Sequence, residues 1–138
     1  MLISSTSNTV VKDAWMPVQD RKILFVRSRD QELFYCVGGK RESHESDHQG
    51  LIRETFEEVG VLLIPKTIVR VATFVGPGHG KSEGMVTILA VFDAEYQGVL
   101  RASSEVAETA WFTTADKHRT TVIGADILDL YASLGKID

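Results

Sequence analysis

The stretch GKRESHESDHQGLIRETFEEVGV, residues 39–61, decides how the rest of the chain is interpreted. Its second half predicts an amphipathic helix from Ser46 to Val59, because at about 100° per residue its apolar side chains share an arc of roughly 140°. This core-facing stripe comprises Leu51, Ile52, Thr55, Phe56 and Val59. Ser46 and Gln49 can form a capping box, and Gly60 can end the helix in a left-handed turn.

The opposite face of this helix carries Arg53, Glu54, Glu57 and Glu58. The first glutamate precedes the other two by three and four positions, and like charges at these spacings destabilise a helix by about 0.2–0.5 kcal/mol per pair. One interpretation is a solvated acidic surface. The other is a site for a hard cation such as magnesium, which prefers carboxylate oxygens as ligands.

The residues before the helix favour the cation site. From Gly39, five residues lead to Glu45 and seven more to Arg53, and the whole stretch closely resembles the Nudix hydrolase signature G-x5-E-x7-R-E-U-x-E-E-x-G-U, in which U is a bulky aliphatic residue. The stretch departs from the usual family pattern in three places, none of which removes a carboxylate: Thr55, His44 and Val37.

The resemblance implies a fold and a reaction. The fold is α/β, a Nudix-type α/β/α sandwich around a mixed β-sheet, and we expect residues 1–138 to form a single Nudix hydrolase domain. The reaction is hydrolysis of a nucleoside diphosphate linked to another moiety, with Mg²⁺ or Mn²⁺ as cofactor. The metal ligands are expected to be Gly39, through its backbone carbonyl, and Glu54, Glu57 and Glu58.

The expected catalytic residues are Glu54, Glu57, Arg53 and Glu105. Arg53 is a poor magnesium ligand, so we expect it to orient a carboxylate, that of Glu45, through a charge-assisted pair. The general base is left open. In some relatives it is a glutamate of the signature, and in others it is a glutamate on a distant loop, for which Glu105 is the first choice here and Glu108 the second.

Two other segments match known functional motifs but lack the structural context that these motifs need. HESDH, residues 44–48, matches the zinc-protease pattern H-E-x-x-H, but Ser46 is the expected helix cap, so His44 precedes the helix and cannot share a face with His48. GPGHGKS, residues 76–82, lacks the first glycine of a P-loop and is followed by an apolar run rather than by a helix start.

Contacts with the substrate are less clearly marked. Arg27, Lys40, His79 and Lys81 are the candidates for binding substrate phosphates. The last two lie in the glycine-rich segment 76–84, for which a flexible connection between strands is the alternative interpretation. Cys36 is expected to be a small buried side chain rather than a nucleophile, because no base for it can be identified.

The composition limits the partners and the compartment. A net charge of -4 argues against a nucleic-acid partner, whereas a phosphorylated small molecule can still bind where cations screen the carboxylates. One cysteine permits no internal disulfide, and neither a signal peptide at residues 1–15 nor a membrane span is recognisable, so the cytoplasm is the expected location. Whether the chain forms a homodimer is left open.

Apolar runs predict the remaining elements. Strands are expected at 22–27, 33–37, 67–75, 85–96 and 110–112, a loop at 38–46, and a closing amphipathic helix at 124–135.

These observations lead to a first hypothesis, a pyrophosphohydrolase that converts an ordinary or oxidised nucleoside triphosphate to monophosphate and pyrophosphate, like MutT-like Nudix enzymes. ADP-ribose or a nucleotide sugar is the alternative substrate. A non-catalytic nucleotide sensor on the same scaffold is the alternative from a different class, and the complete set of signature carboxylates argues against it.

Overall fold

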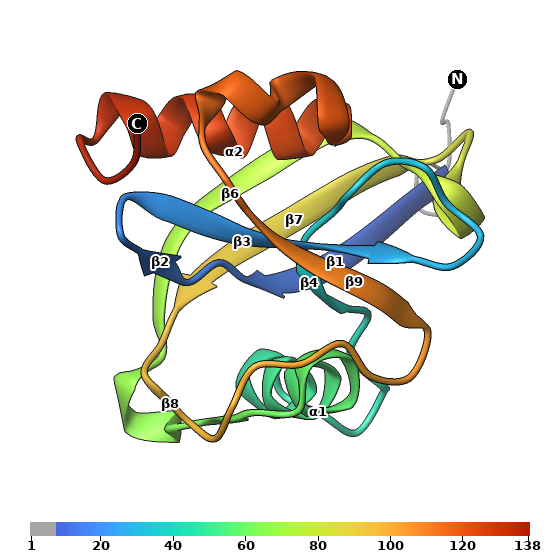
Figure 1. Ribbon diagram of the computed structural model, residues 1–138. Helices are drawn as coiled ribbons and strands as arrows, with labels where there is room; N and C mark the ends of the chain where they lie inside the picture. The colour runs from blue at the N-terminus through green and yellow to red at the C-terminus, as the bar shows by residue number, and fades with distance from the viewer. Residues whose placement is uncertain (1–7) are drawn as a thin grey trace.

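Two helices enclose the strands in the computed structural model, which describes residues 8–138 (Figure 1). The first seven residues of the expected single domain, and with them part of the segment examined for a signal peptide, lie outside the described residues. The strands are β1 (Thr9–Trp15), β2 (Val18–Gln19), β3 (Lys22–Ser28), β4 (Val37–Gly39), β5 (Leu62–Leu63), β6 (Val69–Pro77), β7 (Val86–Asp93), β8 (Tyr96–Gln97) and β9 (Val106–Phe112). The helices are α1 (Asp47–Val59) and α2 (Val122–Ser133), with short 3₁₀ turns η2 (Pro65–Thr67), η3 (Gly80–Ser82) and η4 (Thr114–Arg119).

The predicted α/β/α sandwich around a mixed sheet is confirmed. The largest sheet has the order β4-β1-β7-β6, in which β1 is parallel to β7 and the other pairs are antiparallel. A second sheet has the order β2-β3-β9, and β5 pairs with β8. Helix α1 lies on one side of these strands and α2 on the other (Figure 1).

Strand β3 shows why its sequence is continuously apolar. Ile23 and Phe25 pack in the cluster that includes α2, whereas Leu24 and Val26 pack in the cluster that includes α1. All four side chains are fully buried. A strand with a helix layer on each side has no solvent face, so the alternation of polar and apolar residues disappears.

Helix α1 begins and ends as predicted. Ser46 is the N-cap of a complete capping box with Gln49, and Gly60 ends the helix with a left-handed φ of 73°. The predicted apolar stripe was too wide at one edge, because Phe56 is 53 % exposed. Relative to Leu51, Phe56 is turned by about 140° around the helix, beyond the surface that the strands cover.

Strand β1 was not predicted from the sequence, although it lies in the interior of the largest sheet between β4 and β7. Two adjacent charged residues, Lys12 and Asp13, interrupt its apolar run and hide the strand pattern. Both residues line a cavity of the protein.

The strand predicted at 33–37 was also largely wrong. Phe34 and Tyr35 form only isolated bridges, and regular pairing begins at Val37 and continues through Gly38 and Gly39. The prediction placed these two glycines in a loop. Gly38 has a φ of 141°, and a side chain there would overlap the carbonyl oxygen of Asp13, so glycine is what lets β4 approach β1 this closely.

The remaining predicted elements exist with shifted bounds. The expected strands 67–75 and 85–96 correspond to β6 and β7, and the helix expected at 124–135 corresponds to α2. The short strand expected at 110–112 is the end of the longer β9. Only this end was predicted, because outward-facing polar residues earlier in β9 hide its apolar pattern. Among the described residues, no helix is long and apolar enough to cross a membrane.

Candidate active site

The centre of the candidate site is an ion pair between the loop before α1 and the helix itself. Arg53 donates two hydrogen bonds to the carboxylate of Glu45, from Nε to Oε2 at 2.8 Å and from Nη2 to Oε1 at 2.9 Å. This bidentate pairing lowers the pKa of Glu45 to about 2. Arg53 also donates to the Lys40 carbonyl at 3.3 Å and to Glu54 at 3.1 Å, so the guanidinium ties the loop to the helix.

Two glutamates of α1 lie against the glycine pair of β4. The backbone N–H of Gly38 donates to Glu58 Oε1 at 3.2 Å. A side chain at Gly39 would come within 3.1 Å of both carboxylate oxygens of Glu54, so this position must stay bare for Glu54 to lie there. Burial, and repulsion between these neighbouring carboxylates, raise the pKa of Glu58 well above its ordinary value. Burial raises the pKa of Glu54 as well.

This arrangement fits a divalent cation by its chemistry. Carboxylate oxygens and a backbone carbonyl are the ligands that magnesium and manganese prefer, and a dication would relieve the repulsion between Glu54 and Glu58. In residues 8–138, no three acidic, histidine or cysteine side chains converge on one point as they stand. Arg53 Nη1 instead lies 3.1 Å from Glu54 and 3.4 Å from Glu57, and Glu57 is about half exposed.

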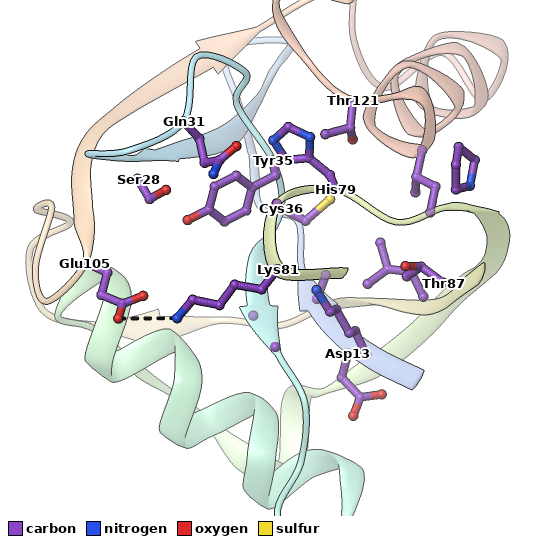
Figure 2. Close-up of a pocket in the computed structure, with 18 of the residues that line it drawn as sticks. Asp13, Ser28, Gln31, Tyr35, Cys36, His79, Lys81, Thr87, Glu105 and Thr121 are labelled. Atoms are coloured by element: carbon purple, nitrogen blue, oxygen red, sulfur yellow. Dashed lines mark ion pairs between the residues drawn. The ribbon is translucent and has the colours of Figure 1, made fainter. Parts of the chain in front are cut away.

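A cavity of about 430 Å³ adjoins the glycine pair. Gly38 and Gly39 belong to its wall, and the Glu58 and Glu54 carboxylates lie against these two glycines. The rest of the wall comes from β1, β7, the segment 28–36, the β6–β7 connection, the turn before β9 and the start of α2. Figure 2 shows the labelled side chains gathered around this space above α1.

Besides Gly39, three of the predicted site residues line this cavity: His79, Lys81 and Glu105. Lys81 and Glu105 reach toward each other from different segments, and their charged atoms are 3.9 Å apart (Figure 2). Both side chains are largely exposed, at 89 % and 79 %. His79 Nε2 is buried without a hydrogen-bond partner in the described part of the chain.

The other two predicted phosphate-binding residues lie outside the cavity wall. Arg27 Nε donates to Glu108 Oε1 at 2.6 Å, across the β3–β9 pair. The same contact engages the carboxylate of Glu108, the second choice for the general base. Lys40 has an exposed side chain, and its backbone carbonyl accepts the hydrogen bond from Arg53.

The structure also argues against a zinc-protease site at residues 44–48. His44 precedes the capping residue Ser46 and its side chain is 76 % exposed. His48 lies in the first turn of α1, where its ring packs edge-on against Phe92 with the ring centres 5.7 Å apart. The two histidines therefore have different surroundings and no common third ligand among residues 8–138.

Several cavity residues were not identified from the sequence, most clearly those of β1. Asp13 is buried, with 2 % of its side chain exposed, and its Oδ2 lies 3.4 Å from Arg41 Nε, which links the loop before α1 to the sheet. Lys12 lines the cavity from the same strand. The sequence signal that could have identified these β1 residues is a pair of adjacent charged residues inside an apolar run. Cys36 also lines the cavity, and burial raises the pKa of its thiol to about 12, which agrees with the expectation that it is not a nucleophile.

Comparison with known proteins bears on the family and the fold. The family model for the NUDIX domain matches residues 11–129. No protein with a curated description matches significantly. Among solved structures, the ORF135 protein of E. coli is 24 % identical, with a TM-score of 0.71 over 92 % of this chain and 91 % of that one.

Two further structures are similar. The MutT NUDIX hydrolase from Burkholderia pseudomallei is 20 % identical, with a TM-score of 0.69 over 87 % of this chain and 95 % of that one. The bifunctional NMN adenylyltransferase/ADP ribose pyrophosphatase from Francisella tularensis, solved with AMP and a manganese ion, is 18 % identical, with a TM-score of 0.65 over 89 % of this chain and 41 % of that one. At these identities the likeness concerns the fold.

Proposed function

The chain belongs to the NUDIX domain family, whose members are generally pyrophosphohydrolases that use divalent metals and act on nucleotides. On this premise we propose that it hydrolyses a nucleoside triphosphate to a monophosphate and pyrophosphate. The observation that carries the proposal is the position of the acidic face of α1. Two of its carboxylates, those of Glu58 and Glu54, lie against Gly38 and Gly39, which also form part of the wall of a 430 Å³ cavity. A cation held there would lie beside a space large enough for a small ligand.

Glu54, Glu57 and Glu58, with the Gly39 carbonyl, are the residues proposed to hold Mg²⁺ or Mn²⁺. A dication there would neutralise charge on the phosphate oxygens and acidify a bound water. Two of these carboxylates are already partly desolvated and held near backbone atoms of β4, which reduces the reorganisation that metal binding needs.

Arg53 and Glu45 are proposed to position the metal-binding face rather than to touch the substrate. Their two hydrogen bonds join the loop to α1, and the additional contact with Glu54 limits the conformations of that ligand. A substitution at Arg53 is therefore expected to act on metal affinity first.

Glu105 is proposed as the general base. It lines the cavity, it is exposed and it forms only a weak pair with Lys81, so it is free to accept a proton from a water molecule. Glu108 is less suitable, because its carboxylate is held by Arg27 at 2.6 Å.

Two substrate classes are candidates, and the triphosphate is our first choice. ADP-ribose or a nucleotide sugar is the second, supported by the similarity in fold to the Francisella tularensis enzyme. In both cases the bond that breaks is a phosphoanhydride bond and the attacking group is water.

A substrate panel with magnesium or manganese tests this proposal. Ordinary and oxidised nucleoside triphosphates, ADP-ribose and nucleotide sugars are each incubated with the protein, and the products are separated. Monophosphate plus pyrophosphate supports the first choice, and AMP plus a sugar phosphate supports the second. No turnover with any member of the panel would contradict the proposal.

A further inference from the structure

Lys12 is an unusual residue for its place in the fold. It lies in the middle of β1, an interior strand of the largest sheet, opposite Leu89 of β7. Leu89 and Ala14, which share its face of the sheet, belong to the apolar cluster around α2. A charged side chain in such a row costs free energy of folding unless a partner compensates for its lost hydration.

No such partner is present in residues 8–138. The Lys12 ammonium makes neither a hydrogen bond nor an ion pair there, although the side chain is half-buried and lines the cavity. The other cations of the cavity wall differ from Lys12, since Arg29 donates to the Ser104 carbonyl at 2.8 Å and the Lys81 side chain is 89 % exposed and keeps its hydration.

The surroundings of Lys12 define what it can bind. Burial is the main effect that lowers its pKa, and Glu58 and Glu54 are close enough to oppose that effect. Asp13, the next residue of β1, pairs with Gly39, against which the Glu54 carboxylate lies, so Lys12 is near the proposed metal ligands. Leu89 and Ile123 supply apolar wall to the same cavity, a surface suited to the uncharged part of a nucleotide.

We propose that Lys12 binds a non-bridging oxygen of the phosphate that joins the nucleoside to the metal-bound end of the substrate. This inference rests on the proposed function for the identity of the ligand. It makes Lys12 a substrate-binding residue that selects phosphorylated nucleosides over nucleosides. The anion supplies the partner that the folded chain lacks, and a strand in the sheet holds the ammonium more firmly than a loop would.

The test compares Lys12→Met with Lys12→Arg, which keeps the charge, and with Lys66→Met, which removes an exposed lysine outside the cavity wall. Calorimetry with magnesium present measures binding of the four common nucleosides and of their 5′-monophosphates. Lys12→Met should weaken monophosphate binding about 10- to 100-fold, as expected for a hydrogen bond between charged groups. Nucleoside binding should stay within about twofold, and Lys12→Arg should recover most of the loss.

Thermal unfolding of the same proteins without ligand gives a second readout. Since methionine removes an uncompensated charge and fills a similar volume, the unfolding midpoint of Lys12→Met should be unchanged or higher. A lysine with a structural role would give a lower midpoint.

Three results would overturn the proposal: a wild-type protein that binds no monophosphate better than its nucleoside, a Lys12→Met variant that loses affinity for both ligands equally, or one whose monophosphate affinity changes by less than about twofold. Failure of the proposed function is separate. It would appear as an absence of hydrolysis in the substrate panel, whereas the preference for monophosphates and its dependence on Lys12 would persist.

Discussion

Two ion pairs of the candidate site, Arg53–Glu45 and Lys81–Glu105, differ in nearly every physical property. The first is bidentate at 2.8 and 2.9 Å, and its carboxylate is 8 % exposed. The second joins two exposed side chains at 3.9 Å. The first pair connects residues eight positions apart, and the second connects two loops. The difference teaches that the loop and the helix on the metal-binding side are already joined before the substrate arrives, which makes this the preassembled side. The other, adaptable side can rearrange around the substrate.

The largest effect is expected on the preassembled side. Glu57→Gln removes one negative oxygen from the proposed metal ligands and should lower kcat about 1000-fold or more, because the metal contributes several kcal/mol of transition-state stabilisation. Glu57 is half exposed, so the free energy of unfolding should change little. Steady-state kinetics and thermal unfolding measure both, and a stable variant with normal turnover would remove Glu57 from the site.

A smaller loss is expected on the adaptable side. Glu105→Gln should lower kcat about 100-fold, the lower range for removal of a general base. Steady-state kinetics at saturating magnesium measures this loss, which should appear in kcat and leave metal affinity unchanged. A variant with kcat within about twofold of wild type would move the role of base to a glutamate of α1.

Arg53→Met tests the preassembled pair itself. It removes both hydrogen bonds to Glu45 and should reduce metal affinity or activity about 10- to 100-fold. Raising the magnesium concentration should restore part of the activity if Arg53 acts through the metal ligands. Activity that stays low at every magnesium concentration would point to a direct contact with the substrate.

The same pair predicts a dependence of stability on pH. The pKa of Glu45 falls from 4.5 to about 2 in the folded chain, so its contribution to stability is present above about pH 4.5 and is lost as the pH falls toward 2. The difference in unfolding midpoint between wild type and Arg53→Met should therefore shrink over this interval. A constant difference would show that the pair does not control the titration of Glu45.

The smallest effect is expected from Lys81→Met. Exposed ion pairs contribute about 0–1 kcal/mol, so stability should hardly change and kcat/KM should fall by less than about fivefold. A loss comparable to that of Arg53→Met would mean that Lys81 binds the substrate directly, and the contrast between the two pairs would then fail.

The sequence predicted the preassembled side far better than the adaptable one. Ser46, Gln49 and Gly60 are local signals for the ends of α1, and the residues of the Arg53–Glu45 pair are close in sequence, so a pattern within one segment contains them. The cavity wall is different, because it joins β1, β7, the segment 28–36, the β6–β7 connection and α2.

Tertiary pairing explains why β1 and the glycine pair of β4 were not predicted from the sequence. Lys12 and Asp13 break the apolar pattern of β1, and only the pairing with β4 and β7 shows that this charged pair lies inside a sheet. Gly38 and Gly39 look like a loop until the close approach of Asp13 is known. In each case the residue type follows from a neighbour distant in the sequence.

Binding of Mn²⁺ alone, followed by electron paramagnetic resonance, tests the central claim most directly. Wild type is compared with a variant in which Glu54, Glu57 and Glu58 are all glutamine, at neutral pH and without nucleotide. The proposed site predicts at least about tenfold weaker binding in the variant. Equal affinity in the two proteins would contradict the assignment of the acidic face of α1 as the metal site.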